Sequence, residues 1–220
     1  MIKKVFFLVF TFTNTCLFSQ LKDQKIEGNK ISQVYFTPKI SSNELFSKIH
    51  YAVSLIYQNS NDVIKYKDEE SKRMIIKAMA LVPVLDVFKL MYPNNTDLSD
   101  YIDYKHNYTA IIEVREEKYR IQLFYEDGKY SDSKMVEYKL PFPAKMNFDS
   151  NDLKKVMKNA TDEMNKSYYI ETRRKKKEIY IQSQPRIVKE YQQTLIDYAV
   201  IFFDSLHEKW KFVSVWKSDD

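Results

Sequence analysis

The chain has 220 residues and a formal net charge of +5, with 44% hydrophobic and 30% charged residues. This mixture is typical of a globular protein and argues against a disordered or collagen-like chain. Gly28 and Gly128 are the only two glycines, which excludes a Gly-rich phosphate loop, a dinucleotide fingerprint and a glycine-flanked nucleophile elbow.

Residues 1–19 have the pattern of a secretory signal peptide. Lys3 and Lys4 form a positive start, an apolar run follows, and Ser19 suits a cut that leaves Gln20 first. The apolar run is too short to span a bilayer, which takes about 20 apolar residues. We therefore expect an exported protein, periplasmic or extracellular, whose mature charge is +5 less the two lysines, or +3. A buried strand of a cytosolic protein is the structural alternative.

The single cysteine, Cys16, lies inside this segment and offers a further alternative. A lipoprotein would be cut before Cys16 and acylated there, but such signals favour Leu and a small residue where this chain has Thr13 and Thr15. A cut after Ser19 removes Cys16, so the mature chain would have neither a disulfide nor a thiolate. No later apolar stretch predicts a transmembrane span.

The first predicted elements are a strand at 31–36 and a helix that begins after Ser41. Ser41 and Glu44 have the spacing of a capping box, in which each side chain satisfies a backbone N–H of the first turn. Apolar residues then recur at helical spacing as far as Tyr57. The polar residues 59–62 predict a turn.

A series of strands follows. The sequence predicts a short strand at 63–66, a charged turn, and a longer strand at 73–82 that Pro83 closes. Alternate residues of the longer strand are apolar and form one face. Residues 83–106 predict an insertion, short and helical or irregular.

Residues 108–114 and 119–125 alternate between apolar and polar and predict a hairpin. Glu116 and Glu117 lie between the two strands. Since this pair is poor chemistry for a primed two-residue turn, we expect a longer or bulged connection. A further strand is predicted at 135–140.

Helical periodicity returns in the last third of the chain. An apolar stripe from Leu153 to Met164 predicts one helix. Ser183 and Pro185 predict the start of a last helix, because proline is tolerated at the first helical position. Residues 211–216 predict a short closing strand or an ordered tail. The apolar stripe of the last helix consists of Ile187, Tyr191, Leu195, Tyr198, Ala199, Phe202 and Leu206.

Three stretches carry a family pattern: 41–46 (SSNELF), 108–114 (YTAIIEV) and 203–206 (FDSL). With them, the segment from Tyr35 to Tyr125 resembles a family of exported bacterial domains of unknown function with a TATA-binding-protein-like fold. The chain departs from that family in lacking glycines in the strand that begins at residue 73. The resemblance implies a fold and no functional residue, because the family has no assigned reaction, and a fold does not imply a function.

The predicted fold is α+β: an antiparallel sheet of about five or six strands with helices packed on one face, plus a helical insertion near the C-terminus. We divide the chain into a signal peptide (1–19), a strand–helix–sheet core (20–148), a basic helical insertion (149–184), and a closing helix and tail of the same domain (185–220).

Candidate catalytic and metal-binding residues are absent from the sequence pattern. His50, His106 and His207 have no second ligand at a zinc spacing. We expect them to be surface or partly buried residues, with His50 and His207 on helices and His106 in a loop. The neighbouring acids at 68–70, 116–117 and 162–163 should face solvent. We therefore predict no catalytic, cofactor-binding or metal-binding residue and no cofactor, while an enzyme site assembled through space stays an alternative.

The sharpest local feature is the basic run Arg173, Arg174, Lys175, Lys176 and Lys177. It predicts a solvated helix face, and the alternative is contact with a polyanion, either anionic lipid or lipopolysaccharide phosphate. We do not expect a nucleic-acid partner. The predicted function is a non-enzymatic exported domain that binds a protein or an envelope component. Polyanion binding by the basic run is the second hypothesis.

Overall fold

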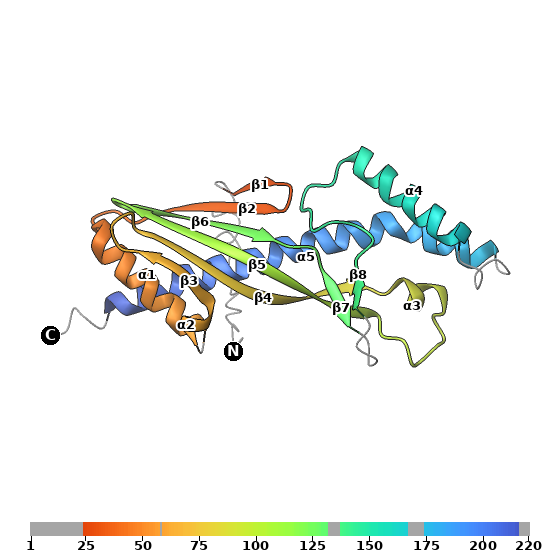
Figure 1. Cartoon of the computed structure of the whole chain (residues 1–220), viewed down its shortest axis with the longest axis horizontal. Helices are drawn as coiled ribbons and strands as arrows, with labels where there is room; N and C mark the ends of the chain where they lie inside the picture. The colour runs from red at the N-terminus through yellow and green to blue at the C-terminus, as the bar shows by residue number, and fades with distance from the viewer. Residues whose placement is uncertain (1–23, 58, 132–136, 167–173, 216–220) are drawn as a thin grey trace, which may run out of the picture.

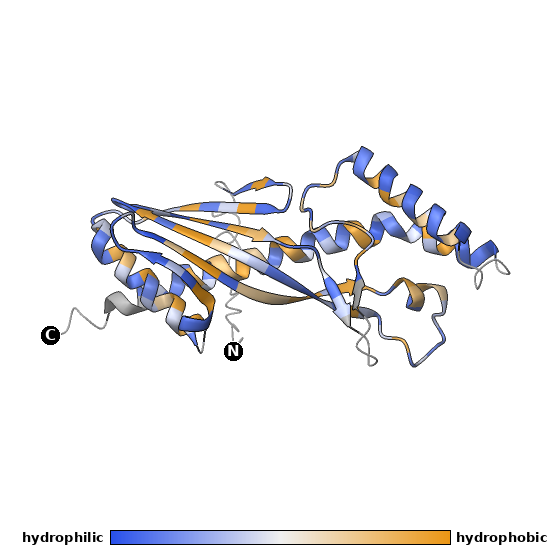
Figure 2. Cartoon of the chain, viewed as in Figure 1, coloured by the Kyte–Doolittle hydropathy of each residue, from blue (hydrophilic) through white to orange (hydrophobic). Residues whose placement is uncertain are grey.

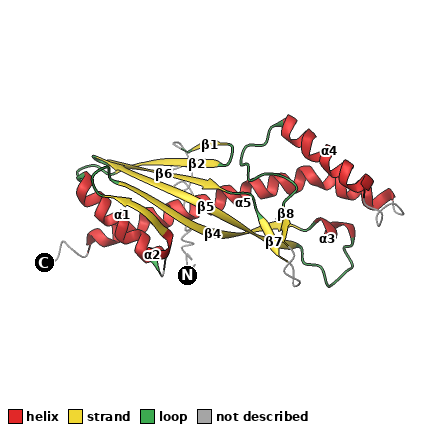
Figure 3. Cartoon of the chain, in the orientation of Figure 1, coloured by secondary structure: helices red, strands yellow, loops and turns green. Residues whose placement is uncertain are grey.

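The structure, a computed structural model, describes residues 24–57, 59–131, 137–166 and 174–215. It is an antiparallel sheet with helices on one face (Figures 1 and 3), which confirms the predicted α+β class. The strands are β1 (Lys25–Glu27), β2 (Lys30–Phe36), β3 (Ile64–Asp68), β4 (Arg73–Leu85), β5 (Tyr101–Arg115), β6 (Lys118–Tyr125), β7 (Lys129–Ser131) and β8 (Glu137–Lys139). The helices are α1 (Ser42–Ile56), α2 (Ser60–Val63), α3 (Val87–Met91), α4 (Ser150–Lys166) and α5 (Arg174–Val215).

The strands are hydrogen-bonded in the order β1-β2-β6-β5-β4-β3, and β7 pairs with β5 and β8. The sheet of the described residues therefore has eight strands, two more than the upper predicted number. The additional ones, β1 and β7, have three residues each. Such short strands show too little alternation to be recognised in a sequence.

The first helix begins as the capping residues predict. The Ser41 hydroxyl accepts the backbone N–H of Glu44 at 3.3 Å, and the Glu44 carboxylate forms an ion pair with Lys48 one turn later. After α1, residues 60–63 form the single-turn helix α2 where a turn was predicted. The strand β3 begins at Ile64 and extends further than the predicted 63–66.

The hairpin of β4 and β5 is longer than predicted at its far end. Pro83 does not close β4, which continues to Leu85, and β5 already begins at Tyr101. The reason lies in the neighbouring strand, because β3 pairs with β4 only as far as Ile76. Beyond that point β4 has β5 on one side only, and proline is tolerated on such an edge because it lacks the N–H that a second neighbour would need. Within the predicted insertion, α3 is the only helix.

The turn between β5 and β6 has two residues, Glu116 and Glu117, so the prediction of a longer connection is wrong. Glu117 adopts a left-handed backbone with φ of 55°. The segment before α1 holds the turn in place, since the Glu117 carboxylate accepts the N–H of Lys39 at 2.9 Å and that of Glu116 accepts the N–H of Ser42 at 3.1 Å. Tertiary contacts thus fix a turn that its own residues do not favour.

The last helix, α5, is a single helix of 42 residues that passes through Pro185. The predicted start at residues 183–185 is therefore wrong, and the boundary drawn at 184/185 lies inside α5. The side chains of Ser183 and Gln184 both donate to the carbonyl of Tyr180, at 3.0 and 3.1 Å, which supplies donors next to the N–H that proline lacks. The helix also includes 211–215, where a strand or tail was predicted.

The core lies between the inner face of the sheet and the helices α1 and α5, as the alternating hydropathy along the strands in Figure 2 indicates. The predicted stripe of α5 is buried except for Tyr198, which is exposed. Phe203, which the prediction omitted, is fully buried instead, because the helix is rotated so that this side faces the sheet. In α4 the predicted stripe is confirmed by the buried Val156, Ala160 and Met164. Among the described helices, none has both the length and the apolar character to cross a membrane.

Candidate functional site

The outer face of the sheet is the first candidate, because no described helix covers it and α5 runs behind the strands in Figure 1. Alternate residues of a strand point to opposite faces, and the strand register aligns the outward-pointing residues of neighbouring strands. Basic residues prevail on this face. They are Lys30, Arg73, Lys77, Lys105, Arg115, Lys118 and Arg120, against the acidic Asp68, Asp103 and Glu113.

Apolar side chains are exposed among these charges. Phe36 is 68% exposed, and Met79 and Leu81 are also exposed. A hollow of about 240 Å³ lies beside Phe36. On its floor Glu113 accepts a hydrogen bond from Nε of Arg120 at 3.1 Å. Apolar groups inside a charged rim are the usual anatomy of a protein–protein interface.

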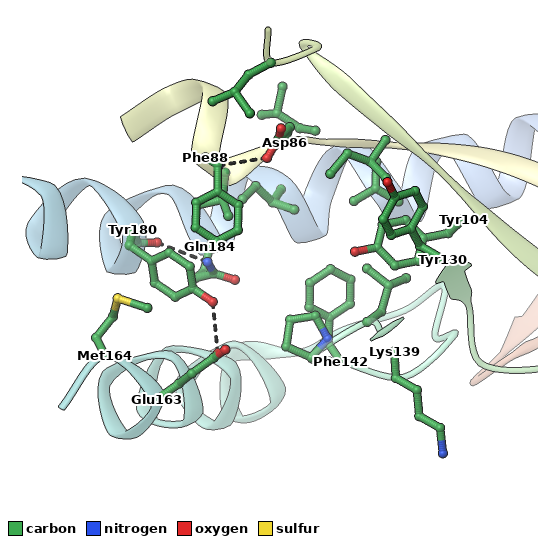
Figure 4. A pocket seen from close by; sticks show the side chains of 18 residues that line it. Asp86, Phe88, Tyr104, Tyr130, Lys139, Phe142, Glu163, Met164, Tyr180 and Gln184 are labelled. Carbon is green, nitrogen blue, oxygen red and sulfur yellow. Dashed lines mark hydrogen bonds between the residues drawn. The ribbon is translucent and has the colours of Figure 1, made fainter. Parts of the chain in front are cut away.

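The second candidate is a cavity of about 600 Å³ beyond the open end of the β4–β5 hairpin (Figure 4). It exists because the protein has two apolar clusters that do not merge. The large core extends to Phe142 and Ile187, whereas a small cluster of α3, α4 and α5 contains Met164 and Tyr180. The two clusters share a contact only through the partly buried Val87. Side chains from both line the space between them.

The cavity wall is apolar and aromatic with a few fixed polar groups. The Tyr180 hydroxyl donates to the Glu163 carboxylate at 2.9 Å, and burial followed by this carboxylate raises the pKa of Tyr180. The Asp86 carboxylate caps α3 by accepting the N–H of Phe88 at 2.8 Å. Five aromatic rings contribute to the wall: Phe88, Tyr104, Tyr130, Phe142 and Tyr180.

The basic run is divided by the structure. Arg173 lies outside the described residues, and Arg174 and Lys175 are exposed at the start of α5. By contrast, the Lys176 ammonium lies 3.1 Å from the centre of the Tyr92 ring, and Lys177 contacts the side-chain oxygen of Asn165 on α4. Two of the four described residues of the run therefore hold the helical part together, while its role in polyanion contact stays a prediction.

His106 is a correction to the sequence analysis. It lies in β5 and is fully buried, whereas a partly buried loop position was predicted. Its Nδ1 lies 2.9 Å from the carbonyl oxygen of Glu126, so Nδ1 carries the proton, and Nε2 faces the Tyr191 hydroxyl at 3.5 Å. Burial lowers the pKa of His106. This histidine is a neutral core residue.

His207 is also buried, on the sheet-facing side of α5. Its Nδ1 lies 2.7 Å from the Tyr119 hydroxyl and 3.3 Å from Nε1 of Trp210, and the Tyr35 ring stacks on it at 4.3 Å. Because the indole N–H only donates, Nδ1 must be the acceptor. Burial, together with the nearby Lys211, lowers the pKa of His207 to about 4.

The remaining polar candidates are also held in structural contacts. Asp68 accepts N–H groups of its own turn, and Glu116 and Glu117 fix the β5–β6 turn. Glu163, expected in open solvent, instead lines the cavity. No three His, Cys, Asp or Glu residues of the described chain gather in a group that could hold a metal ion. The cavity itself gave no signal in the sequence, because its lining comes from several separate segments.

No protein-family model matches the chain, and no curated protein matches it. Two solved structures are similar. A TBP-like protein from Parabacteroides distasonis is 13% identical with a TM-score of 0.46, over 84% of this chain and 93% of that one. A DUF4468 family protein from Bacteroides ovatus is 9% identical with a TM-score of 0.46, over 82% and 85%. Both are of the kind that the sequence resemblance names.

Proposed function

We propose that the protein is an exported, non-enzymatic binding protein whose outer sheet face docks an acidic surface of a protein partner. The observation that carries this proposal is the uncovered sheet face, where exposed apolar side chains stand among a surplus of basic ones. Complementary charge steers association and selects partners, while buried apolar anchors supply most of the affinity. Phe36, beside the hollow, is the natural anchor.

Export is supported by the order of charge, apolar run and small residue in 1–19, a segment outside the described residues. Mass spectrometry of the protein from its native host should find Gln20 as the first residue. An intact Met1, or a lipid on Cys16, would contradict the periplasmic or extracellular protein proposed here.

Site-specific photo-crosslinking tests the docking face. A photoreactive amino acid replaces Met79 on the outer face or, as the matched control, Tyr51, which is similarly exposed on α1. In the native envelope extract, Met79 should crosslink to one discrete protein with an acidic surface, and Tyr51 should not. Equal crosslinking from both positions, or none from Met79, would refute the assignment of this face.

Charge reversal provides the second measurement with the partner so identified. Lys77→Glu with Lys105→Glu should weaken its binding more than tenfold at low salt, because both lysines are exposed on the outer face. Lys154→Glu with Lys155→Glu makes the same change of charge on the exposed side of α4 and should leave binding unchanged. Equal losses in the two variants would mean that net charge, rather than this face, governs the association.

A further inference from the structure

We propose that the cavity beside α3 binds a small amphiphile that has an apolar alkyl or aryl body and one ammonium group. This site is separate from the outer sheet face and is independent of the function proposed for that face. The proposal follows from the size of the cavity, from the composition of its wall, and from the sign of the charges directed into it.

The size and wall suit a small molecule with a large apolar part. A volume of about 600 Å³ lies within the range of ligand pockets, roughly 300–1,000 Å³, which are mostly apolar with a few fixed polar groups. Here the apolar wall comes from four different parts of the fold, with Leu85, Ile102, Phe142 and Met164 as examples. A ligand would therefore touch both apolar clusters and fill the space that separates them.

The charges of the wall favour a cation over an anion. Asp86 and Glu163 contribute carboxylates, and Lys139 is the only basic residue of the lining. Figure 4 shows the Lys139 side chain directed away from the other lining residues. An anionic head group would thus meet like charges, whereas an ammonium would meet carboxylates and the negative faces of aromatic rings, which attract cations.

The position of the ammonium follows from the arrangement in Figure 4. Glu163 and Tyr180 lie on one side of the space, and Tyr104 and Tyr130 lie on the other. Glu163 is exposed to solvent at the surface of α4, so an ammonium beside it keeps part of its hydration. The Asp86 carboxylate is already occupied in part by the N–H of Phe88. We therefore place the head group at Glu163 and the apolar body toward Phe142.

The test uses three probes of equal chain length: decylamine, decanol and decanoate, each below its micelle concentration. Isothermal titration should show that decylamine binds most tightly and decanoate most weakly. Glu163→Gln should reduce the affinity for decylamine about three- to fivefold, the range of a partly exposed ion pair. The same variant should leave decanol unchanged. The matched control, Lys77→Glu on the outer face, should not alter either affinity.

A second measurement needs no variant. In protein with isotopically labelled methionine methyl groups, decylamine should shift the signal of Met164, which lines the cavity, and leave that of Met79 on the outer face in place. Decanoate bound as tightly as decylamine, a shift of Met79 without Met164, or no binding of any probe would overturn the proposal.

Discussion

Acidification should destabilise the protein through His207. Its pKa is about 4 in the folded protein, against an unfolded value of about 6.5. Below pH 6.5 the unfolded chain takes up a proton that the folded chain still refuses. The stabilisation by neutral His207 is therefore complete above pH 6.5 and is lost as the pH falls toward 4. Between pH 7.5 and pH 4 the loss amounts to about 3 kcal/mol, a large part of a typical folding free energy of about 5–15 kcal/mol.

The structure provides a variant that isolates this contribution. In His207→Asn the amide oxygen can take the place of Nδ1 as the acceptor for Tyr119 and Trp210, but it does not titrate. The variant should be less stable by about 1 kcal/mol at neutral pH, because it loses the stack on Tyr35. Asp204, whose pKa burial raises, titrates with the opposite sign and is present in both proteins.

Urea unfolding followed by tryptophan fluorescence at a series of pH values measures the difference. The free energy of unfolding of the wild type should fall by about 3 kcal/mol more than that of His207→Asn between pH 7.5 and pH 4. His106, whose pKa burial also lowers, contributes equally to both curves. Parallel curves would show that His207 is not held neutral, and would refute the account of the buried cluster.

Three further changes test the packing. Phe202→Ala removes a buried ring from α5 and should cost roughly 2–5 kcal/mol, whereas its 63% exposed neighbour, as Ile201→Ala, should unfold at nearly the wild-type temperature; equal melting temperatures would contradict the orientation of α5. Gly128→Ala would drive its new methyl group into the His106 ring and should destabilise by about 1–3 kcal/mol, and an unchanged urea midpoint would show that this contact is loose. Replacing all of 173–177 by Gln should leave the fold intact and cost little more than the cation–π contact, about 0.5–1 kcal/mol. Salt-sensitive binding of anionic vesicles by the wild type, lost in this variant, would favour the polyanion hypothesis instead.

Local patterns were sufficient where a segment's own residues satisfy it. The Ser41 cap, the strand at 31–36 and the alternation at 108–114 each produce the element that they predict, because capping and one-sided burial act over a few residues. The same patterns failed where a neighbour decides. Pro83 lies within a strand because β3 stops short of it, and Pro185 lies within a helix whose two halves are both buried.

The candidate sites divide in the same way. The sequence alone determined the alternation that gives the sheet one apolar and one polar face, because the side chains of a strand point alternately to opposite sides. It could not show which face the helices leave uncovered, nor that His106 and His207 are buried, because both depend on packing between distant segments. The cavity belongs wholly to the tertiary structure. It is the space left where two apolar clusters, built from residues far apart in the chain, come close without merging.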